Sequence, residues 1–257
     1  RAALAAAHAE LTAGLGDDAP VAVRSSATSE DSADASFAGL QDTYLWLRGL
    51  AAVESHLRRC WASLYSEASV GYRRRLKMPE AGVAMGVVVQ RMVDARSAGV
   101  VFTRSPSTGD RSVITLEAAW GLGSAVVGGE VTPDRFTVNK VTLEVLSRTV
   151  SDKGVRHVPA PGGGVVDEPV PADQRLAPSV SDEELQALAR IAKRVEQHYG
   201  RAQDIEWAID RRLPLPEAIF LLQSRPETVW SQRDAEPVVP QRATAFDHLM
   251  ATLRGGR

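Results

Sequence analysis

Three polar side chains near the end of the chain have types and spacing suited to binding a metal ion and phosphate. The stretch "QDIEWAIDRRLPLPEAIFLLQSRPE", Gln203 to Glu227, is typical of two short strands joined by a proline-containing turn. In such a hairpin Glu206 lies opposite Gln223, and Asp204 lies opposite Arg225. A carboxylate and an amide oxygen suit a hard cation such as Mg²⁺, and an arginine binds phosphate oxygens through its planar fork.

The alternation of apolar and polar residues predicts two faces for this hairpin. In the first strand one face carries Ile205, Trp207 and Ile209, and the other carries Asp204, Glu206, Ala208 and Asp210. In the return strand Leu221, Gln223 and Arg225 share a face. An exposed polar face with an Asp204–Arg225 salt bridge explains the same residues. The hairpin alone therefore leaves both interpretations open.

Two other segments have features of a nucleotide site. In "VRSSATSEDSADASFAG" the small residues leave backbone amides open to an anion, and Arg24 adds a fixed charge. In "VVVQRMV" the chain passes from a buried run to a charged turn at Gln90, and Met92 is adaptable enough to pack on adenine. Taken singly, a surface turn and an ordinary buried strand explain these segments equally well.

Composition excludes several classes of function. The 257 residues include 30 basic and 32 acidic side chains, a net charge of -2, which gives no electrostatic reason to expect nucleic acid or an anionic membrane as partner. The single cysteine, Cys60, excludes an intrachain disulfide framework and a cysteine-based zinc site. No apolar run approaches a membrane span, and no signal peptide is evident. We expect a cytoplasmic protein.

The hydrophobic pattern predicts alternating helices and strands. We expect a helix at the N-terminus, strands near residues 21 and 42–47, one long helix over 51–77, adjacent antiparallel strands over 82–114, further strands over 134–149 and a loop over 151–180. A last helix begins after Ser181, with Glu184 as its capping-box partner, and ends near Gly200. The hairpin follows it.

Several motifs in one order resemble a known family. They are "VAVRSSATSEDSADASFAG", "CWASLYSE", "VVVQRMV", "GVVFTRSPSTGD", "EAAWGLG" and "YGRAQDIEWAI…LLQSRPET", spread over residues 21–229. Together they resemble the ATP-binding domain of phosphoenolpyruvate synthase, pyruvate phosphate dikinase and rifampin phosphotransferase. The resemblance implies an α/β fold of the ATP-grasp type, with mixed and antiparallel sheets and flanking helices.

The resemblance also implies roles for individual residues. Arg24 is similar to a phosphate-contacting arginine, and Gly39 and Thr43 lie on the glycine-bearing phosphate loop. Gln90, Met92 and Val93 match the adenine-side segment. Glu206 and Gln223 match the magnesium ligands, and Arg225 matches an arginine on the transferred phosphates. Arg24 and Arg225 are the candidate catalytic residues.

In this family ATP gives its β-phosphate to a histidine on a separate swivelling domain, and AMP remains. The five histidines of this chain lack the small-residue setting of such a phosphohistidine, so that domain and the acceptor-binding domain are expected elsewhere, in the same or a partner chain. The chain begins at Arg1, about twenty residues before Arg24, and the lysine-bearing N-terminal part of the module is expected to be missing. Ser124 stands where the family usually has an acidic residue, and Leu40 replaces a common glutamine.

These observations predict three parts of the chain. Residues 1–80 form the remainder of a first lobe, 81–230 a second lobe with the adenine segment and metal hairpin, and 231–257 a linker or tail. The predicted function is Mg-ATP binding within a phosphoenolpyruvate synthase-like dikinase, a phosphotransferase whose isolated fragment is incomplete for turnover. One alternative is an antibiotic kinase of the rifampin phosphotransferase type. The other is a non-catalytic nucleotide-binding or assembly module.

Overall fold

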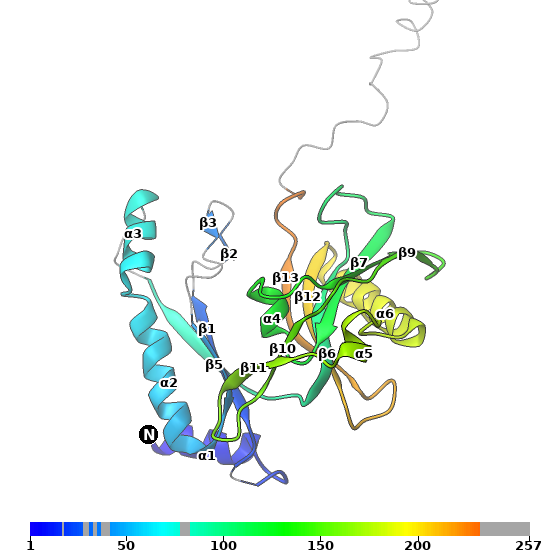
Figure 1. The fold of residues 1–257 in the computed structure, drawn as a ribbon. Coiled ribbons are helices and arrows are strands. Elements are labelled where there is room, and N and C mark those ends of the chain that lie inside the picture. The colour runs from blue at the N-terminus through cyan, green and yellow to red at the C-terminus, as the bar shows by residue number, and fades with distance from the viewer. Residues whose placement is uncertain (17, 28–30, 33–34, 37–41, 78–82, 232–257) are drawn as a thin grey trace, which may run out of the picture. The chain divides into compact units, whose positions relative to one another are not determined.

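The chain forms antiparallel sheets flanked by helices (Figure 1), which confirms the predicted α/β class at this level. The structure is a computed structural model and describes residues 1–16, 18–27, 31–32, 35–36, 42–77 and 83–231. One unit comprises Arg1–Glu227, and a second comprises Thr228–Arg257. None of the described helices is both long enough and apolar enough to cross a bilayer. The predicted division of the chain into two lobes and a tail, at residues 80 and 230, stays a prediction.

The larger sheet contains six strands in the order β13-β12-β6-β7-β8-β9. Their bounds are β6 (Ala95–Phe102), β7 (Val113–Trp120), β8 (Asp134–Asn139), β9 (Val145–Thr149), β12 (Gln203–Asp210) and β13 (Ile219–Pro226). The strands from residue 134 onward continue the sheet as expected. Gly99 on β6 is sterically required, because a Cβ there would lie 1.8 Å from the Glu117 carbonyl oxygen on β7.

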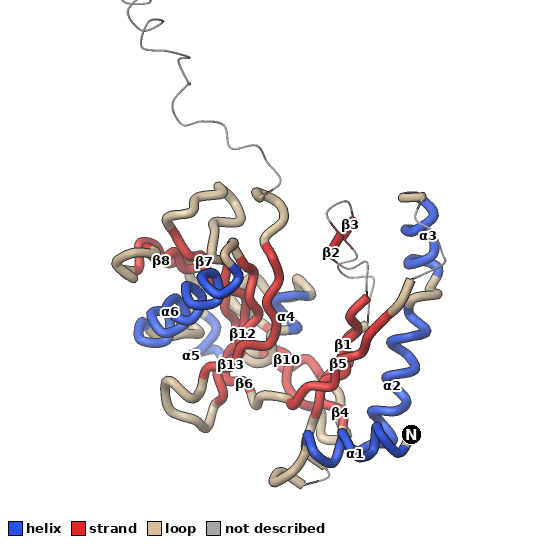
Figure 2. The backbone as a smooth tube through the Cα atoms, turned by 180° about the vertical axis from the view of Figure 1, so that it is seen from behind, coloured by secondary structure: helices blue, strands red, loops and turns tan. Residues whose placement is uncertain are grey.

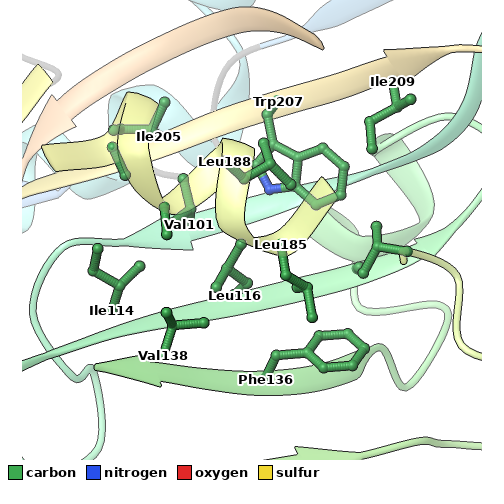
Figure 3. Close-up of a cluster of buried hydrophobic side chains, with 14 of the residues drawn as sticks. Val101, Ile114, Leu116, Phe136, Val138, Leu185, Leu188, Ile205, Trp207 and Ile209 are labelled. Atoms are coloured by element: carbon green, nitrogen blue, oxygen red, sulfur yellow. The ribbon is translucent and has the colours of Figure 1, made fainter. Parts of the chain in front are cut away.

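One long helix, α6 (Asp182–Tyr199), covers a face of this sheet against β6, β8 and β12. Ser181 and Glu184 form the predicted capping box, and Gly200 ends the helix with φ +65°. The main core lies between helix and sheet (Figure 3) and includes Val101, Ile114, Leu116, Phe136, Val138, Leu185, Leu188, Ile205, Trp207 and Ile209. This core fixes which face of β12 points away from α6.

The smaller sheet has three strands in the order β4-β1-β5, and helix α2 packs on it (Figure 2). The bounds are β1 (Val21–Ala27), β4 (Thr43–Leu47), β5 (Met85–Arg91) and α2 (Gly49–Ser63). Its core contains the fully buried Val21, Val23, Val53 and Cys60. Burial raises the pKa of the Cys60 thiol to about 11.

Smaller elements complete the described chain. They are α1 (Ala2–Leu11), β2 (Asp31–Ser32), β3 (Ala35–Ser36), α3 (Glu67–Arg75), α4 (Ser124–Val127), β10 (Val155–Pro159), β11 (Val165–Pro169) and α5 (Ala172–Arg175). β10 pairs with β11 as a hairpin, and α4 packs against β7 and β10.

The prediction of one helix over 51–77 is wrong, because α2 and α3 are separate helices. Ser66 between them has an extended backbone, with φ −61° and ψ 152°, and its hydroxyl accepts a hydrogen bond from the Ser69 amide at 3.2 Å. A serine that caps the next helix competes with continuation of the preceding one. The apolar spacing alone did not distinguish these outcomes.

Two other predictions also need correction. Of the strands expected to be adjacent over 82–114, β6 and β7 are paired, but β5 pairs with β1 in the smaller sheet. The segment 151–180, expected to be a loop, contains the β10–β11 hairpin and α5. Its turn includes Gly163 and Gly164, both with positive φ, and glycine-rich turns weaken any periodic signal.

A buried ion pair fixes the segments that lead into α6. Asp134 and Lys153 are both fully buried, and the Lys153 ammonium donates to the Asp134 carboxylate at 2.5 Å. The carboxylate also accepts from the Ser151 amide at 3.1 Å and from the Ser179 amide and hydroxyl, each at 2.8 Å. Asp134 therefore joins β8 to both ends of the 151–180 segment.

We expect Lys153→Met to destabilise the chain by about 3–5 kcal/mol, because it leaves the Asp134 carboxylate buried without its cation. Denaturant unfolding monitored by circular dichroism measures this change. The control is Arg148→Met, which breaks the exposed Arg148–Asp182 pair of 2.8 Å and should cost less than about 1 kcal/mol. Equal losses of stability in Lys153→Met and Arg148→Met would contradict the special cost that we assign to the buried Asp134–Lys153 pair.

Candidate functional site

A cavity of about 530 Å³ is lined by strands of both sheets. It contains most of the residues predicted to bind a nucleotide: Arg24, Thr43, Gln90, Met92, Val93, Glu206, Gln223 and Arg225. Gly39, the remaining predicted residue, lies outside the described residues. Arg24 and Arg225, which are 201 positions apart in the sequence, therefore line the same cavity.

The hairpin β12–β13 supplies the acidic side of the cavity. The predicted register is confirmed, because Glu206 pairs with Gln223 and Asp204 pairs with Arg225. Ile205 and Trp207 are fully buried on the opposite face, toward α6. The alternation of β12 thus directs Asp204 and Glu206 to the cavity.

The predicted face of β13 is wrong at one position. Glu206 lies opposite Gln223, and the next residue, Trp207, lies opposite Leu221. Leu222 is therefore an extra residue on β13 with no partner of its own on β12. Leu222 lines the cavity with Gln223 and Arg225, whereas Leu221 is 41% exposed and does not line it. A β-bulge of this kind interrupts the alternation from which the face was predicted.

Arg24 joins β1 of the smaller sheet to this hairpin. A single guanidinium nitrogen, Nη2, donates to Glu206 Oε2 at 2.6 Å and also to Gln223 Oε1. Both oxygens therefore converge on one point. Thr43 lies beside Arg24, since the two residues are partners in the β1–β4 pairing.

The other side of the cavity is apolar. Met92 and Val93 follow β5 and pack with Leu122, Ala208 and Leu222. Gln90 donates from Nε2 to the Leu222 carbonyl at 3.2 Å, which ties β5 to β13. Ala208 lies two residues beyond Glu206 on the same strand face, about 7 Å along the strand. The cavity thus has a charged end and an apolar end.

Asp204 also lines the cavity and was absent from the predicted site list. Its Oδ1 atom is buried and has no hydrogen-bond partner among the described residues. Burial, and to a smaller extent the nearby Glu227 carboxylate, raises the pKa of Asp204 to about 6, although Arg225 acts in the opposite direction. The alternation that selected Glu206 already placed Asp204 on the same face, so the sequence contained this signal.

Comparison with known proteins was made for the whole chain. Residues 1–245 match the family described as "Pyruvate phosphate dikinase, AMP/ATP-binding domain". A probable phosphoenolpyruvate synthase of Staphylothermus marinus is 43% identical over 243 residues, covering 87% of this chain and 29% of that relative. A phosphoenolpyruvate synthase of Aeropyrum pernix is 43% identical over 261 residues, covering 92% and 32%.

A rifampicin phosphotransferase of Streptomyces sviceus is 42% identical over 250 residues, covering 97% of this chain and 27% of that relative. The chain therefore spans about a third of the length of these relatives. These matches confirm the resemblance drawn from the sequence motifs.

Asp204→Asn should stabilise the metal-free chain at pH 8 by about 1–2 kcal/mol, because the variant removes a desolvated carboxylate. Between the ordinary aspartate pKa and a pH of about 6, Asp204 binds a proton in the native state that it does not bind in the unfolded state. The stability of the parent chain therefore falls as pH rises through that window, and the advantage of the variant is lost toward pH 4. Denaturant unfolding in EDTA at pH 8 and at pH 4 measures the stability difference between the variant and the parent chain.

The control is Asp152→Asn, because Asp152 is exposed and the Arg175 guanidinium lowers its pKa. This variant should show no gain at pH 8. A gain of the same size in Asp152→Asn, or a gain in Asp204→Asn that is independent of pH, would contradict the assignment.

Proposed function

The chain belongs to the pyruvate phosphate dikinase AMP/ATP-binding domain family, and we propose from this that its cavity binds ATP together with Mg²⁺. The observation that supports the proposal most directly is the convergence of Glu206 and Gln223 on one Arg24 nitrogen. The ATP-grasp architecture with two lobes is part of the same proposal.

The apolar end of the cavity suits the adenine base. Met92, Val93 and Leu222 offer apolar contact, and the backbone around residues 91–93 borders the cavity. Because Gln90 Nε2 is held by the Leu222 carbonyl, its position relative to β13 is fixed. We assign adenine to this end because nucleotide bases bind in apolar clefts that have a few oriented polar groups.

The charged end suits the phosphates and the cation. Arg24 and Arg225 supply guanidinium groups, which bind phosphate oxygens with two parallel hydrogen bonds. Glu206 and Gln223 offer one carboxylate and one amide oxygen, a donor set that fits Mg²⁺. When bound, Mg²⁺ would neutralise phosphate charge, which is a main contribution to catalysis of phosphoryl transfer.

Arg24 has a specific part in this proposal. Its Nη2 donates to both oxygens that we assign to the cation. If Glu206 and Gln223 held a cation with these oxygens, the Arg24 guanidinium would be available to bind phosphate oxygens instead. Arg24 thus stabilises the two acceptors before binding and the phosphates afterwards.

We propose that the whole protein is a dikinase of the phosphoenolpyruvate synthase type. In that reaction the β-phosphate of ATP passes to a histidine on a separate swivelling domain, and AMP and orthophosphate are the other products. The support is the similarity to phosphoenolpyruvate synthases that are about three times as long. A cytoplasmic location remains a prediction.

A rifampin phosphotransferase-like antibiotic kinase is the second candidate, favoured by the similarity to a rifampicin phosphotransferase. The two candidates share the nucleotide site and differ in the acceptor. A non-catalytic nucleotide-binding or assembly module is the third. Binding of ATP without dependence on Mg²⁺ would favour that third function.

Glu206→Ala and Gln223→Ala should each weaken Mg²⁺-dependent ATP binding about tenfold or more, since each removes a contact to a charged group. Calorimetric titration of the chain with ATP, with and without Mg²⁺, measures the affinities. Glu217→Ala is the matched control, because Glu217 lies on the exposed connection of the same hairpin. Unchanged affinity in both site variants would overturn the metal assignment.

Arg225→Lys should weaken ATP binding about tenfold, because an ammonium cannot reproduce two parallel hydrogen bonds to phosphate. The same titration measures it. Arg212→Lys is the control, since Arg212 is 72% exposed on the same hairpin. If Arg225→Lys binds ATP as tightly as the parent chain, Arg225 serves only the pairing of the two strands.

A further inference from the structure

A second group of ligand-type side chains lies at the β10–β11 hairpin, outside the proposed Mg²⁺ position. His157 is on β10, Asp167 is its cross-strand partner on β11, and Glu130 follows α4. His157 Nε2 lies 3.1 Å from Glu130 Oε2 and 3.2 Å from Asp167 Oδ1. The ligand atoms of the three residues all lie within 4.8 Å of one another.

We propose that Glu130, His157 and Asp167 form a binding site for a divalent first-row transition cation such as Zn²⁺. In a tetrahedral zinc site with bonds of about 2.0–2.2 Å, neighbouring ligand atoms are about 3.3–3.6 Å apart. The two observed separations are close to this value. Small movements of the exposed carboxylates are therefore sufficient for coordination.

The charge of the cluster also calls for a cation. Two carboxylates approach the same imidazole nitrogen, and a lone pair there would face two negative oxygens. Either the hydrogen of an Nε2–H group or a metal ion must therefore lie between them. Two carboxylates and a neutral imidazole give a formal charge of −2, which a divalent cation balances.

The second ring nitrogen is already held in the way that metal-ligating histidines require. His157 Nδ1 lies 2.8 Å from the Ser124 hydroxyl oxygen. Donation from Nδ1–H to Ser124 leaves the Nε2 lone pair directed at Glu130 and Asp167. Such outer contacts fix the tautomer and the ring orientation of a ligating histidine.

Backbone contacts make the arrangement rigid. The Leu122 amide donates to the His157 carbonyl at 3.0 Å, and Gly121 forms an isolated parallel bridge with His157. The Glu130 amide donates to the Ala125 carbonyl at 3.0 Å. A bound cation therefore joins the β10–β11 hairpin to the segment around α4.

The site is open to solvent on one side. The side chains of Glu130 and Asp167 are 51% and 68% exposed, whereas that of His157 is 9% exposed. The three residues line a second cavity of about 390 Å³, together with Tyr44 and His56. This leaves room for water as a further ligand. An imidazole nitrogen among the ligands favours Zn²⁺ over Mg²⁺, which prefers oxygen ligands.

Zn²⁺ titration of the EDTA-treated chain by calorimetry, in excess Mg²⁺, tests the proposal. We expect one Zn²⁺ per chain, and a loss of affinity of about tenfold or more in the isosteric variants Glu130→Gln and Asp167→Asn. Co²⁺ in place of Zn²⁺ should give visible absorption bands that these variants weaken. Circular dichroism checks that the variants are folded.

Two controls identify the site. Glu206→Ala should keep full Zn²⁺ affinity, and so should Glu168→Gln, which changes an adjacent carboxylate that pairs with Arg156. Equal Zn²⁺ affinity in the parent, Glu130→Gln and Asp167→Asn chains would mean adventitious binding and would overturn the proposal. Failure of the folded parent chain to bind Zn²⁺ would also overturn it and assign the cluster to hydrogen bonds between His157 Nε2–H and the two carboxylates.

Discussion

The two-faced strand β12 is the constraint on which the rest of the structure depends. One face carries Ile205, Trp207 and Ile209 into the core beneath α6, and each such side chain contributes about 1.5–3 kcal/mol by burial. The other face therefore has to present Asp204 and Glu206 to the cavity. Because β12 pairs with β6 on one side and β13 on the other, its position and rotation are fixed from both edges. The apolar core thus offsets the cost of holding a desolvated Asp204 carboxylate beside Glu227.

Features that depend on local sequence were predictable. The capping box of α6 needs only Ser181 and Glu184, three residues apart, and the register of Glu206 with Gln223 follows from one short hairpin. Prediction failed where the outcome depends on something beyond the local pattern. The bulge at Leu222 inserts one residue without changing composition, and the break between α2 and α3 depends on whether Ser66 caps a new helix. Apolar periodicity describes one face of an element and does not reveal such interruptions.

Contacts between distant segments were the least predictable part of the site. Sequence periodicity identifies β5 as a strand, but it does not state that β1 rather than β6 is its partner. The motifs gave Arg24, Glu206 and Gln223 as separate candidates by resemblance. Arg24 lies 182 positions before Glu206, and one of its guanidinium nitrogens contacts both the Glu206 and the Gln223 oxygen. Only the three-dimensional structure shows this shared contact. The motifs therefore named residues that line one cavity in the structure, and the sheets determine how these residues are arranged.

Ser124 lines both the proposed nucleotide cavity and the cavity beside His157. It lines the proposed nucleotide cavity, and its hydroxyl oxygen also lies 2.8 Å from His157 Nδ1. An acidic residue at position 124 would bring a third carboxylate to an imidazole that already faces Glu130 and Asp167. A hydroxyl accepts from Nδ1–H without adding charge, and it keeps its own proton to donate elsewhere. The serine is therefore electrostatically consistent with the cluster around His157, and the residue at position 124 and that cluster are best understood as one arrangement.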